Sequence, residues 1–433
     1  MFGRVPGFIR FVADPQVWRE IFRLRRLVEE HRTHTTTAST DLARFVWKML
    51  CMQKIVRFGD TYVVNSFAPP FPSKAFETMT LRSLRAVEYG ASQRLVLPPV
   101  ATHVAITNNC PLHCWHCSNA DRPGQRDMPT EHWLKVLAEL QEWGVCMIAF
   151  TGGEPLVHPQ LEQMIASLDE RSVTFIFTSG FGLDARRARH LKDAGLFGVI
   201  VSLDHYEEAR HDQMRGFKGA HTHAIRALEE SRSAGMYTIL QLVTTKELLH
   251  SGGLYRMFEL GRRLNVHEVR IMSPVPTGRL FYAGDDVLLT EKEQQQIIEI
   301  DKHANGLLGY PKVCSFNRVE STELLGCGAG SLHSYIDAAG NVYPCDLVPL
   351  SFGSVVEQSF RDIWCQVSTL INGPRSRCFM HDNVEAVRQA ANGQLPLPAE
   401  TSHRICQQCQ ESDAPDRYHR WGQIWQQKRE IVL

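Results

Sequence analysis

The chain has 433 residues, of which 43% are hydrophobic and 22% are charged, and its 47 basic residues balance its 47 acidic ones. A net charge of zero gives no long-range attraction toward nucleic acid, so no nucleic-acid partner is expected. No segment approaches the roughly 20 uninterrupted apolar residues of a membrane span. Because Arg4 and Arg10 interrupt the apolar start of the chain, we expect no signal peptide and a cytoplasmic protein.

Residues 1–98 are predicted to form a helical extension. Helices are expected near 15–31, 41–53 and 80–89, and Pro98-Pro99 marks a boundary. Residues 1–60 hold 11 lysines and arginines against 6 aspartates and glutamates, interleaved with aromatic residues. We favour packing on the next domain with a solvated basic face. The alternative is contact with a substrate or with a membrane surface, on which basic aromatic helices can lie.

Residues 99–280 alternate between short apolar segments and longer amphipathic ones, which predicts an α/β domain. Strands are expected at 103–108, 146–151, 173–178, 198–203, 237–244 and 267–273, with helices at 130–143, 158–170, 184–194, 220–234 and 254–264. Gly144, Gly195 and Gly235 follow three of these helices, where a left-handed cap favours glycine. Strands joined by helices imply a parallel sheet covered on both faces. An open doubly wound sheet and a six-strand partial barrel both fit this pattern.

Three cysteines follow the first predicted strand, in the spacing Cys110-x-x-x-Cys114-x-x-Cys117. Loops at the carboxyl ends of parallel strands build active sites. Without a secretory signal, clustered thiols are more typical of metal ligands than of disulfides. The spacing supplies one ligand fewer than a closed tetrahedral site, so zinc with His113 or His116 as the fourth ligand is one alternative.

A second motif, Thr151-Gly152-Gly153-Glu154-Pro155, ends the second predicted strand and therefore faces the same mouth. Paired glycines let the backbone approach a ligand closely. Glu154 is placed to accept hydrogen bonds from an ammonium group. Taken alone, the motif fits a simple strand-to-helix turn equally well.

The cysteine triplet and the Gly-Gly-Glu-Pro segment together resemble the radical S-adenosylmethionine (SAM) superfamily, over roughly residues 100–280. The resemblance implies a partial (β/α)6 TIM-like barrel in which Cys110, Cys114 and Cys117 bind three irons of a 4Fe-4S cluster. SAM would chelate the fourth iron and be cleaved to a 5′-deoxyadenosyl radical that abstracts hydrogen from a substrate. An electron donor such as flavodoxin or ferredoxin is implied as well.

Further strand ends match the family. Ser179 follows the third predicted strand, Ser202 and Asp204 follow the fourth, and His116 stands where the family usually has an aromatic residue. Helix capping is the alternative explanation for Ser179 and Asp204. Arg279, after the sixth strand, can pair with a substrate anion or form a surface salt bridge. The implied cofactor-binding residues are His116, Gly152, Gly153, Glu154, Pro155, Ser179, Ser202 and Asp204, and no catalytic acid or base is identified.

Residues 281–433 lose the alternation and form a small cysteine-rich domain. Cys327 and Cys345 flank a predicted hairpin with its turn at 338–341. Cys406-x-x-Cys409 is a knuckle that can present two sulfurs to one metal. The segment between them, 372–403, is predicted to be a long loop that returns the knuckle to the hairpin. A four-cysteine zinc site in a non-enzymatic protein is the alternative.

Cys327, Gly340 and Cys345 resemble the SPASM and shorter twitch extensions of radical SAM enzymes, which carry auxiliary 4Fe-4S clusters. The full SPASM pattern continues with more cysteines, but none follows Cys409. The resemblance therefore implies one auxiliary cluster on Cys327, Cys345, Cys406 and Cys409. Cys314 and Cys378 are the spare candidates, while Cys51, Cys146 and Cys365 are predicted to be core residues.

The same resemblance favours a peptide substrate, modified as a maturase modifies a ribosomal peptide, or an oxidative reaction. The basic and aromatic N-terminal extension favours instead a lipid or small metabolite at a membrane surface. The residues themselves leave this choice open.

Overall fold

The computed structural model describes residues 5–31, 53–89, 96–120, 126–371 and 373–409. Cys51 and all but the last residue of the helix predicted at 41–53 lie outside this range. None of the described helices is long and apolar enough to cross a membrane.

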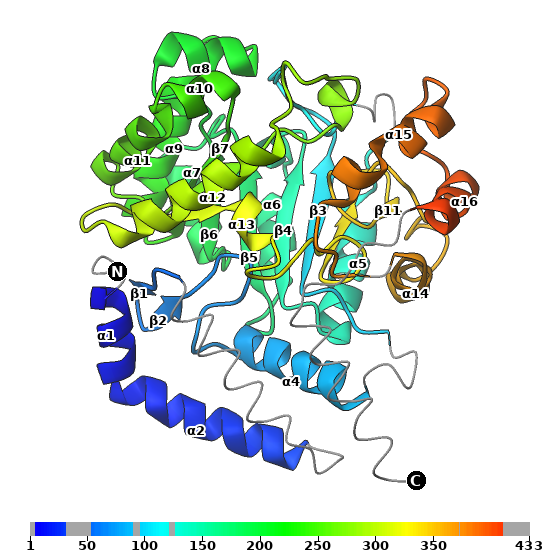
Figure 1. Cartoon of the computed structure of the whole chain (residues 1–433). Coiled ribbons are helices and arrows are strands. Elements are labelled where there is room, and N and C mark those ends of the chain that lie inside the picture. The colour runs from blue at the N-terminus through cyan, green and yellow to red at the C-terminus, as the bar shows by residue number, and fades with distance from the viewer. Residues whose placement is uncertain (1–4, 32–52, 90–95, 121–125, 372, 410–433) are drawn as a thin grey trace.

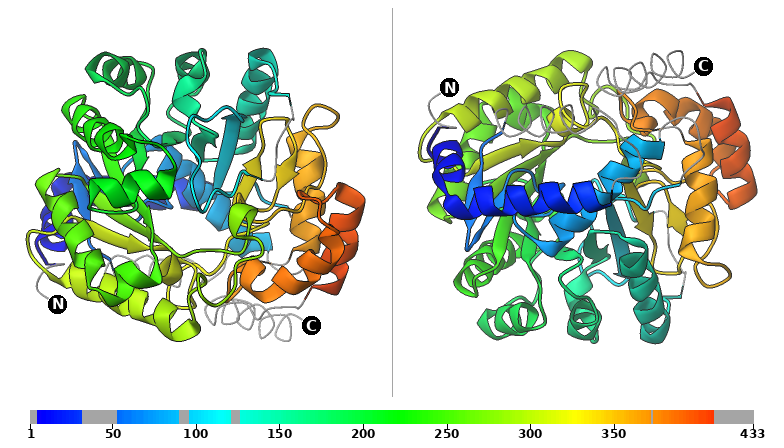
Figure 2. Two further views of the ribbon diagram at one scale, coloured as in Figure 1. Left: turned by 90° about the horizontal axis from the view of Figure 1, so that it is seen from above. Right: turned by 90° about the horizontal axis from the view of Figure 1, so that it is seen from below.

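A nine-stranded sheet organises the molecule, in the strand order β11-β10-β3-β4-β5-β6-β7-β8-β9 (Figure 1). Its middle confirms the six predicted strands, which run parallel: β3 (Ala101–Thr107), β4 (Met147–Gly152), β5 (Val173–Thr178), β6 (Gly198–Ser202), β7 (Tyr237–Val243) and β8 (Glu268–Met272). The curved sheet with helices outside it is a partial barrel, which decides between the two architectures that periodicity allowed (Figure 2).

Strands from beyond residue 280 extend the sheet at both edges. β9 (Lys312–Ser315) pairs parallel with β8, and β10 (His333–Ile336) pairs parallel with β3. β11 (Val342–Tyr343) returns antiparallel to β10, with Tyr335 opposite Tyr343, so the predicted hairpin is confirmed. This hairpin brings the C-terminal part of the chain next to the first barrel strand.

Helices cover the outer face of the sheet (Figure 2): α5 (Thr130–Trp143), α6 (Leu161–Ala166), α7 (Ala185–Asp193), α8 (Glu208–Arg215), α9 (Ala220–Ser233), α10 (Lys246–His250), α11 (Gly253–Arg263) and α12 (Glu291–Gly306). Asp184 caps α7 as predicted, accepting a hydrogen bond from the Arg187 N–H at 2.8 Å. Gly144, Gly195 and Gly235 all have positive φ, as predicted for residues that end helices.

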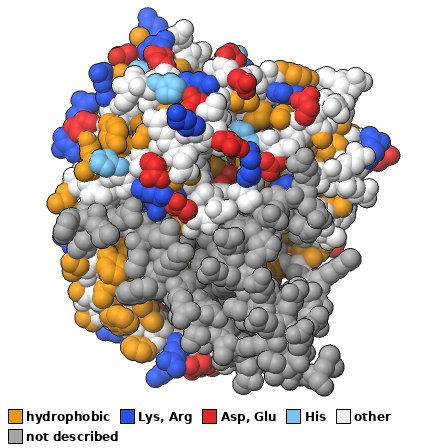
Figure 3. Space-filling model, viewed as in Figure 1, with side chains coloured by type: hydrophobic (Ala, Val, Ile, Leu, Met, Phe, Trp, Pro, Cys, Tyr) orange, Lys and Arg blue, Asp and Glu red, His pale blue; other side chains and the backbone are white. Residues whose placement is uncertain are grey.

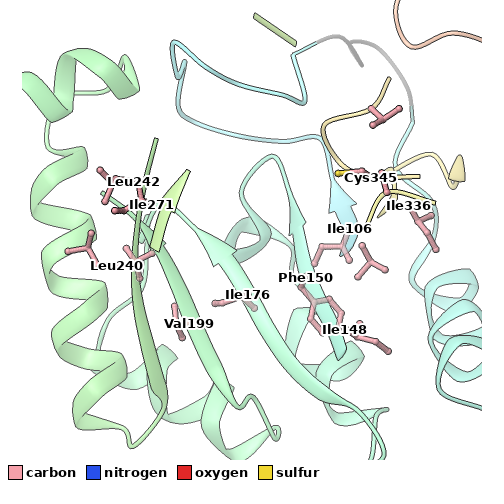
Figure 4. Close-up of a cluster of buried hydrophobic side chains, with 14 of the residues drawn as sticks. Ile106, Ile148, Phe150, Ile176, Val199, Leu240, Leu242, Ile271, Ile336 and Cys345 are labelled. Atoms are coloured by element: carbon pink, nitrogen blue, oxygen red, sulfur yellow. The ribbon is translucent and has the colours of Figure 1, made fainter. Parts of the chain in front are cut away.

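Each barrel strand sends branched or aromatic side chains outward into one large core, as Ile106, Phe150 and Ile176 do (Figure 4). Cys345 lies at the end of this row, beside Ile336 and Ile106 (Figure 4). The inner face has a smaller core that includes Phe175 and Tyr237. Burial on both faces explains the continuous apolar strands.

The N-terminal extension contains α1 (Val5–Ala13), α2 (Pro15–Glu30), a hairpin of β1 (Val56–Phe58) and β2 (Thr61–Val63), and α4 (Lys74–Tyr89). α2 and α4 lie across the end of the barrel opposite the carboxyl ends of its strands (Figures 1 and 2). The helices predicted at 15–31 and 80–89 are confirmed. The hairpin was not expected, because three-residue strands show no measurable alternation.

The C-terminal part contains α13 (Phe316–Val319), α14 (Phe360–Leu370), α15 (Phe379–Ala391) and α16 (Ala399–Gln408). The long loop predicted at 372–403 is therefore wrong, since α15 and the start of α16 occupy most of it. Phe379, Met380, Val387 and Ala391 bury one face of α15 at helical spacing. Its three alanines are the best of the helix formers.

Candidate cluster and cofactor site

The cysteine triplet lies in the loop at the carboxyl end of β3, as predicted. Cys110 is exposed as a whole residue, whereas Cys114 and Cys117 are half-buried. The Cys110 sulfur is nevertheless partly buried, which raises the pKa of its thiol to about 12, and the backbone N–H of Leu112 opposes that rise. This backbone hydrogen bond therefore favours the thiolate form of the cysteine, which is the form that binds metal.

This feature recurs at four of the seven predicted cluster ligands. In each, the backbone N–H two residues further along the chain donates to the cysteine sulfur: Leu112 to Cys110, Asn119 to Cys117, Ala329 to Cys327 and Leu347 to Cys345. Cys146, predicted to be a core residue, is fully buried and receives no such bond from two residues further on. Because N–H donors stabilise thiolates and modulate iron–sulfur clusters, these residues fit 4Fe-4S ligation.

The paired glycines hold the cysteine loop against β4. A Cβ on Gly152, whose φ is +132°, would lie 2.2 Å from the Thr107 carbonyl oxygen, and one on Gly153 would lie 2.3 Å from that of Asn109. The N–H of Gly153 donates to Thr107 at 2.7 Å, and that of Glu154 donates to Asn109 at 2.8 Å. The sequence analysis expected these glycines to let the backbone approach a ligand closely. In the structure, they let the end of β4 approach the cysteine loop closely.

Glu154 joins two neighbouring strand ends. Its carboxylate is buried and accepts four hydrogen bonds, at 2.6 to 3.1 Å, from the Leu156 N–H, the Thr178 hydroxyl, and the N–H and hydroxyl of Ser179. Burial raises the pKa of this carboxyl group, and the four donors oppose the rise. Pro155 follows at the start of a short 3-10 helix (Pro155–Val157). Glu154 therefore also orients Ser179, a further predicted cofactor residue.

Asp204 is the centre of a buried charge network beside the cysteine loop. Its Oδ2 lies 3.1 Å from His116 Nε2 and 2.8 Å from the Arg215 guanidinium. Although burial raises the pKa of Asp204, the charges of Arg215 and His116 hold it well below its ordinary value. Asp204 thus positions His116, which stands where the family usually has an aromatic residue.

Arg215, at the end of α8, was missed by the sequence analysis. Its buried guanidinium lies 3.6 Å from the Cys114 sulfur, and its carbonyl accepts the His113 N–H at 2.9 Å. No recognised motif marks it, because only the fold brings α8 to the cysteine loop. A fixed positive charge next to Cys114 favours the thiolate.

The segment after β8 closes the site from the other side. Gly278 has a φ of +52°, and a Cβ there would lie 2.1 Å from the Cys117 carbonyl oxygen. Arg279 donates from its guanidinium to the Cys114 carbonyl at 3.0 Å.

Ser202 is half-buried at the end of β6, opposite Gln241 of β7. The structure therefore brings every predicted cofactor residue to the carboxyl ends of β3 to β6.

The C-terminal cysteines form two adjacent pairs. The Cys327 thiol hydrogen-bonds with that of Cys378, which together with burial holds the pKa of Cys327 well above its usual value. A hydrogen bond between the thiols of Cys406 and Cys409 raises the pKa of the first and lowers that of the second.

Arg375 connects the two pairs. Its backbone pairs with Cys327 at 2.8 and 3.0 Å, and its charge acts on both Cys406 and Cys409. Of the two spare candidates, Cys378 therefore lies at this site. Cys314 lies apart on β9, buried beside Glu268.

A polar cluster beside Cys345 was also missed. Asp346 Oδ1 lies 3.1 Å from His333 Nε2 and 3.7 Å from His103 Nδ1. Among the described residues, His103, His333 and Asp346 form the group of three side chains of metal-ligand type whose ligand atoms all lie within 4.8 Å of one another.

Two family models match the chain. The Radical SAM superfamily model matches residues 104–248, and the SPASM iron-sulfur cluster-binding domain matches residues 327–410. The PqqA peptide cyclase of Granulibacter bethesdensis is 29% identical over 280 residues, covering 62% of this chain and 74% of that protein. The corresponding protein of Rhizobium meliloti is 27% identical over 319 residues, covering 68% and 81%.

The fold is similar to that of solved structures. Streptococcus suis SuiB bound to its precursor peptide SuiA superimposes with a TM-score of 0.51 at 15% identity, over 66% of this chain and 70% of that one. Such a likeness supports the partial-barrel architecture alone.

Proposed function

This chain is a radical SAM enzyme with a C-terminal SPASM domain, and from that premise we propose that it modifies a peptide substrate. Its cofactors are SAM and 4Fe-4S clusters. The observation that carries the peptide assignment is the similarity to PqqA peptide cyclases, which covers 62% and 68% of this chain for the two relatives compared above. The chain thereby resembles maturases of ribosomal peptides.

We propose that Cys110, Cys114 and Cys117 hold the cluster that binds SAM. When bound, that cluster supplies the electron that cleaves SAM and so creates a hydrogen-abstracting radical. The guanidinium of Arg215 offsets the thiolate charge at Cys114, from 3.6 Å. The loop is packed against Gly153 and Gly278, which keeps the three thiols in place.

The proposed SAM site comprises His116, Gly152, Gly153, Glu154, Pro155, Ser179, Ser202 and Asp204. Two of them act chiefly through neighbours. Asp204 fixes the ring of His116, and Glu154 fixes the hydroxyl of Ser179. A SAM ammonium group at Glu154 would have to share a carboxylate that already accepts four hydrogen bonds.

We propose one auxiliary cluster on Cys327, Cys345, Cys406 and Cys409. Arg375 supports this set, because it adjoins both halves. Four thiolates leave no open iron, so this cluster would pass electrons rather than bind substrate. Cys378 is a fifth thiol next to Cys327.

Two partners are proposed in addition to the peptide. A small redox protein such as flavodoxin or ferredoxin would supply electrons. As the alternative to packing on the barrel with a solvated basic face, the N-terminal helices would contact a membrane surface through Trp18 and Phe22, which are 42% and 59% exposed, with Arg19 and Arg26 exposed beside them. Hydrophobic side chains gather at the lower left of Figure 3, where α1 lies in the same view.

The test is anaerobic reconstitution of the full chain followed by incubation with SAM, dithionite and short peptides encoded beside its gene. We expect about eight irons, 5′-deoxyadenosine, and a peptide whose mass falls by two hydrogens or changes by a new crosslink. A colourless, zinc-containing protein would overturn the enzyme assignment. Turnover with a lipid or metabolite but with no encoded peptide would overturn the substrate class.

A further inference from the structure

Two histidines and an aspartate meet where the C-terminal hairpin joins the first barrel strand. His103 lies on β3 and His333 on β10, and these two strands are paired in parallel. Asp346 follows β11, the strand that returns antiparallel to β10. Because backbone pairing holds both histidines in one sheet, their positions are fixed more precisely than loop residues would be.

The spacing of the three side chains fits a single metal ion. Asp346 Oδ1 lies 3.1 Å from His333 Nε2 and 3.7 Å from His103 Nδ1, and all three ligand atoms are within 4.8 Å of one another. Ligand atoms on a tetrahedral zinc ion lie about 3.3 to 3.6 Å apart, since Zn–N and Zn–O bonds are about 2.0 to 2.2 Å long. The distance from Asp346 to His103 is too long for a hydrogen bond. Hydrogen bonding therefore accounts for the approach of His333 but not for that of His103.

The surroundings of Asp346 favour a cation. Its Oδ1 accepts a hydrogen bond from the Cys345 thiol at 3.4 Å, and that donor is lost when the sulfur binds iron as a thiolate. The carboxyl group of Glu320 also acts electrostatically on Asp346. Negative groups this close to one another in a half-buried place repel strongly, and a divalent ion on Asp346 would offset that repulsion.

The basic side chain next to His103 does not supply this compensation. Arg270 acts on His103, but its Nε lies 3.6 Å from Glu268 Oε1, and its guanidinium stacks over the Phe67 ring at 4.7 Å. Its charge is thus directed toward Glu268 and not toward Asp346.

The ligand types indicate which ion fits. Two imidazoles and one carboxylate are typical ligands of zinc and ferrous iron, whereas magnesium and calcium prefer oxygen alone. Three protein ligands leave at least one coordination position open. The side chains of His103, His333 and Asp346 are 18%, 19% and 33% exposed, so an ion and a further ligand can reach them from solvent.

We propose that His103, His333 and Asp346 bind one divalent ion of the zinc or ferrous type, in addition to the proposed clusters. The ion is separate from the auxiliary cluster, because no cysteine belongs to its ligand set. The site does not rest on the proposed function, since a metal bound here is expected whatever substrate the chain modifies.

The experiment adds zinc chloride to the full, cluster-loaded chain, removes loose metal by gel filtration in citrate, and measures zinc and iron by elemental analysis. Wild type is expected to retain about one zinc ion and about eight irons. His103→Gln and His333→Gln should keep their iron but bind zinc at least about tenfold more weakly. His250→Gln is the matched control, because it breaks a surface pair in which Nε2 lies 3.0 Å from Glu293 Oε1, and it should retain zinc.

Zinc X-ray absorption of the wild-type chain is a second measurement that needs no variant. Nitrogen and oxygen neighbours without sulfur are expected, whereas sulfur neighbours would assign the zinc to the cysteines and overturn the proposal. It is likewise overturned if wild type retains no zinc, or if zinc survives both histidine substitutions. Loss of iron together with zinc in both variants would make the histidines part of the cluster site and would overturn a separate ion.

Discussion

The cysteine loop after β3 and the C-terminal cysteines differ in how much of the chain each site needs. The loop contains all three of its thiols within eight residues. The carbonyls of Thr107 and Asn109, just before it, accept hydrogen bonds from the N–H groups of Gly153 and Glu154. The C-terminal thiols come from separate segments: Cys327 before the hairpin, Cys345 after it, and Cys406 and Cys409 at the end of α16. Protein contacts alone can preorganise the first site, whereas the second would need the proposed auxiliary cluster to join its segments.

The largest expected effect is at the first site. Cys114→Ala should abolish SAM cleavage and lower the iron content from about eight to about four per chain, because two thiolates cannot retain a cluster with an open iron. Formation of 5′-deoxyadenosine with dithionite measures the first effect and iron analysis the second. Cys365→Ala, on the half-buried face of α14, is the matched control and should keep both. Continued cleavage by Cys114→Ala would refute the ligand assignment.

In the second prediction, the C-terminal site loses its cluster and the first site keeps its own. Changing both Cys406 and Cys409 to Ala should remove about four irons and leave about four. SAM cleavage should persist, while peptide product falls much further. Hydrogen exchange of α15 and α16 should also rise more than that of the barrel strands, because the cluster no longer joins the segments. An unchanged iron content would place the ligands elsewhere, with Cys378 as the first alternative.

A third prediction concerns the packing that preorganises the loop. Gly153→Ala places a Cβ 2.3 Å from the Asn109 carbonyl oxygen, so the loop must shift away from β4. We expect partial loss of the first cluster and several-fold slower SAM cleavage, with the auxiliary cluster retained. Gly284→Ala, whose Cβ would meet only the Asp286 side chain at 3.3 Å, is the control. Equal iron content in the two variants would show that the loop tolerates displacement.

The smallest effect is expected far from both sites. Burial, helped by Arg232, lowers the pKa of His267 to about 3, while its unfolded value is about 6.5. The unfolded chain therefore binds a proton that the folded chain does not, and stability falls as the pH drops below about 6.5. Between pH 6.5 and 5, the Tm of His267→Gln should fall less than that of wild type. Parallel curves would show that folding leaves the pKa of His267 at its ordinary value.

What the sequence predicts depends on how locally each feature is encoded. The six barrel strands, the cap at Asp184 and the cysteine triplet are specified within short windows, and all are found where expected. Arg215 contacts Cys114 across 101 positions of sequence, and His103 meets Asp346 only because β10 pairs with β3. Residues 372–403 were misassigned because only the burial of one face distinguishes the short amphipathic helix α15 from a loop.

The backbone N–H groups that point at Cys110, Cys117, Cys327 and Cys345 have a consequence for how this chain can vary. The donors belong to Leu112, Asn119, Ala329 and Leu347, but their side chains play no part in the bond. Any residue there keeps the donor except proline, which has no N–H. Each of these four positions can therefore accept any amino acid except proline and still keep the hydrogen bond to the proposed ligand sulfur.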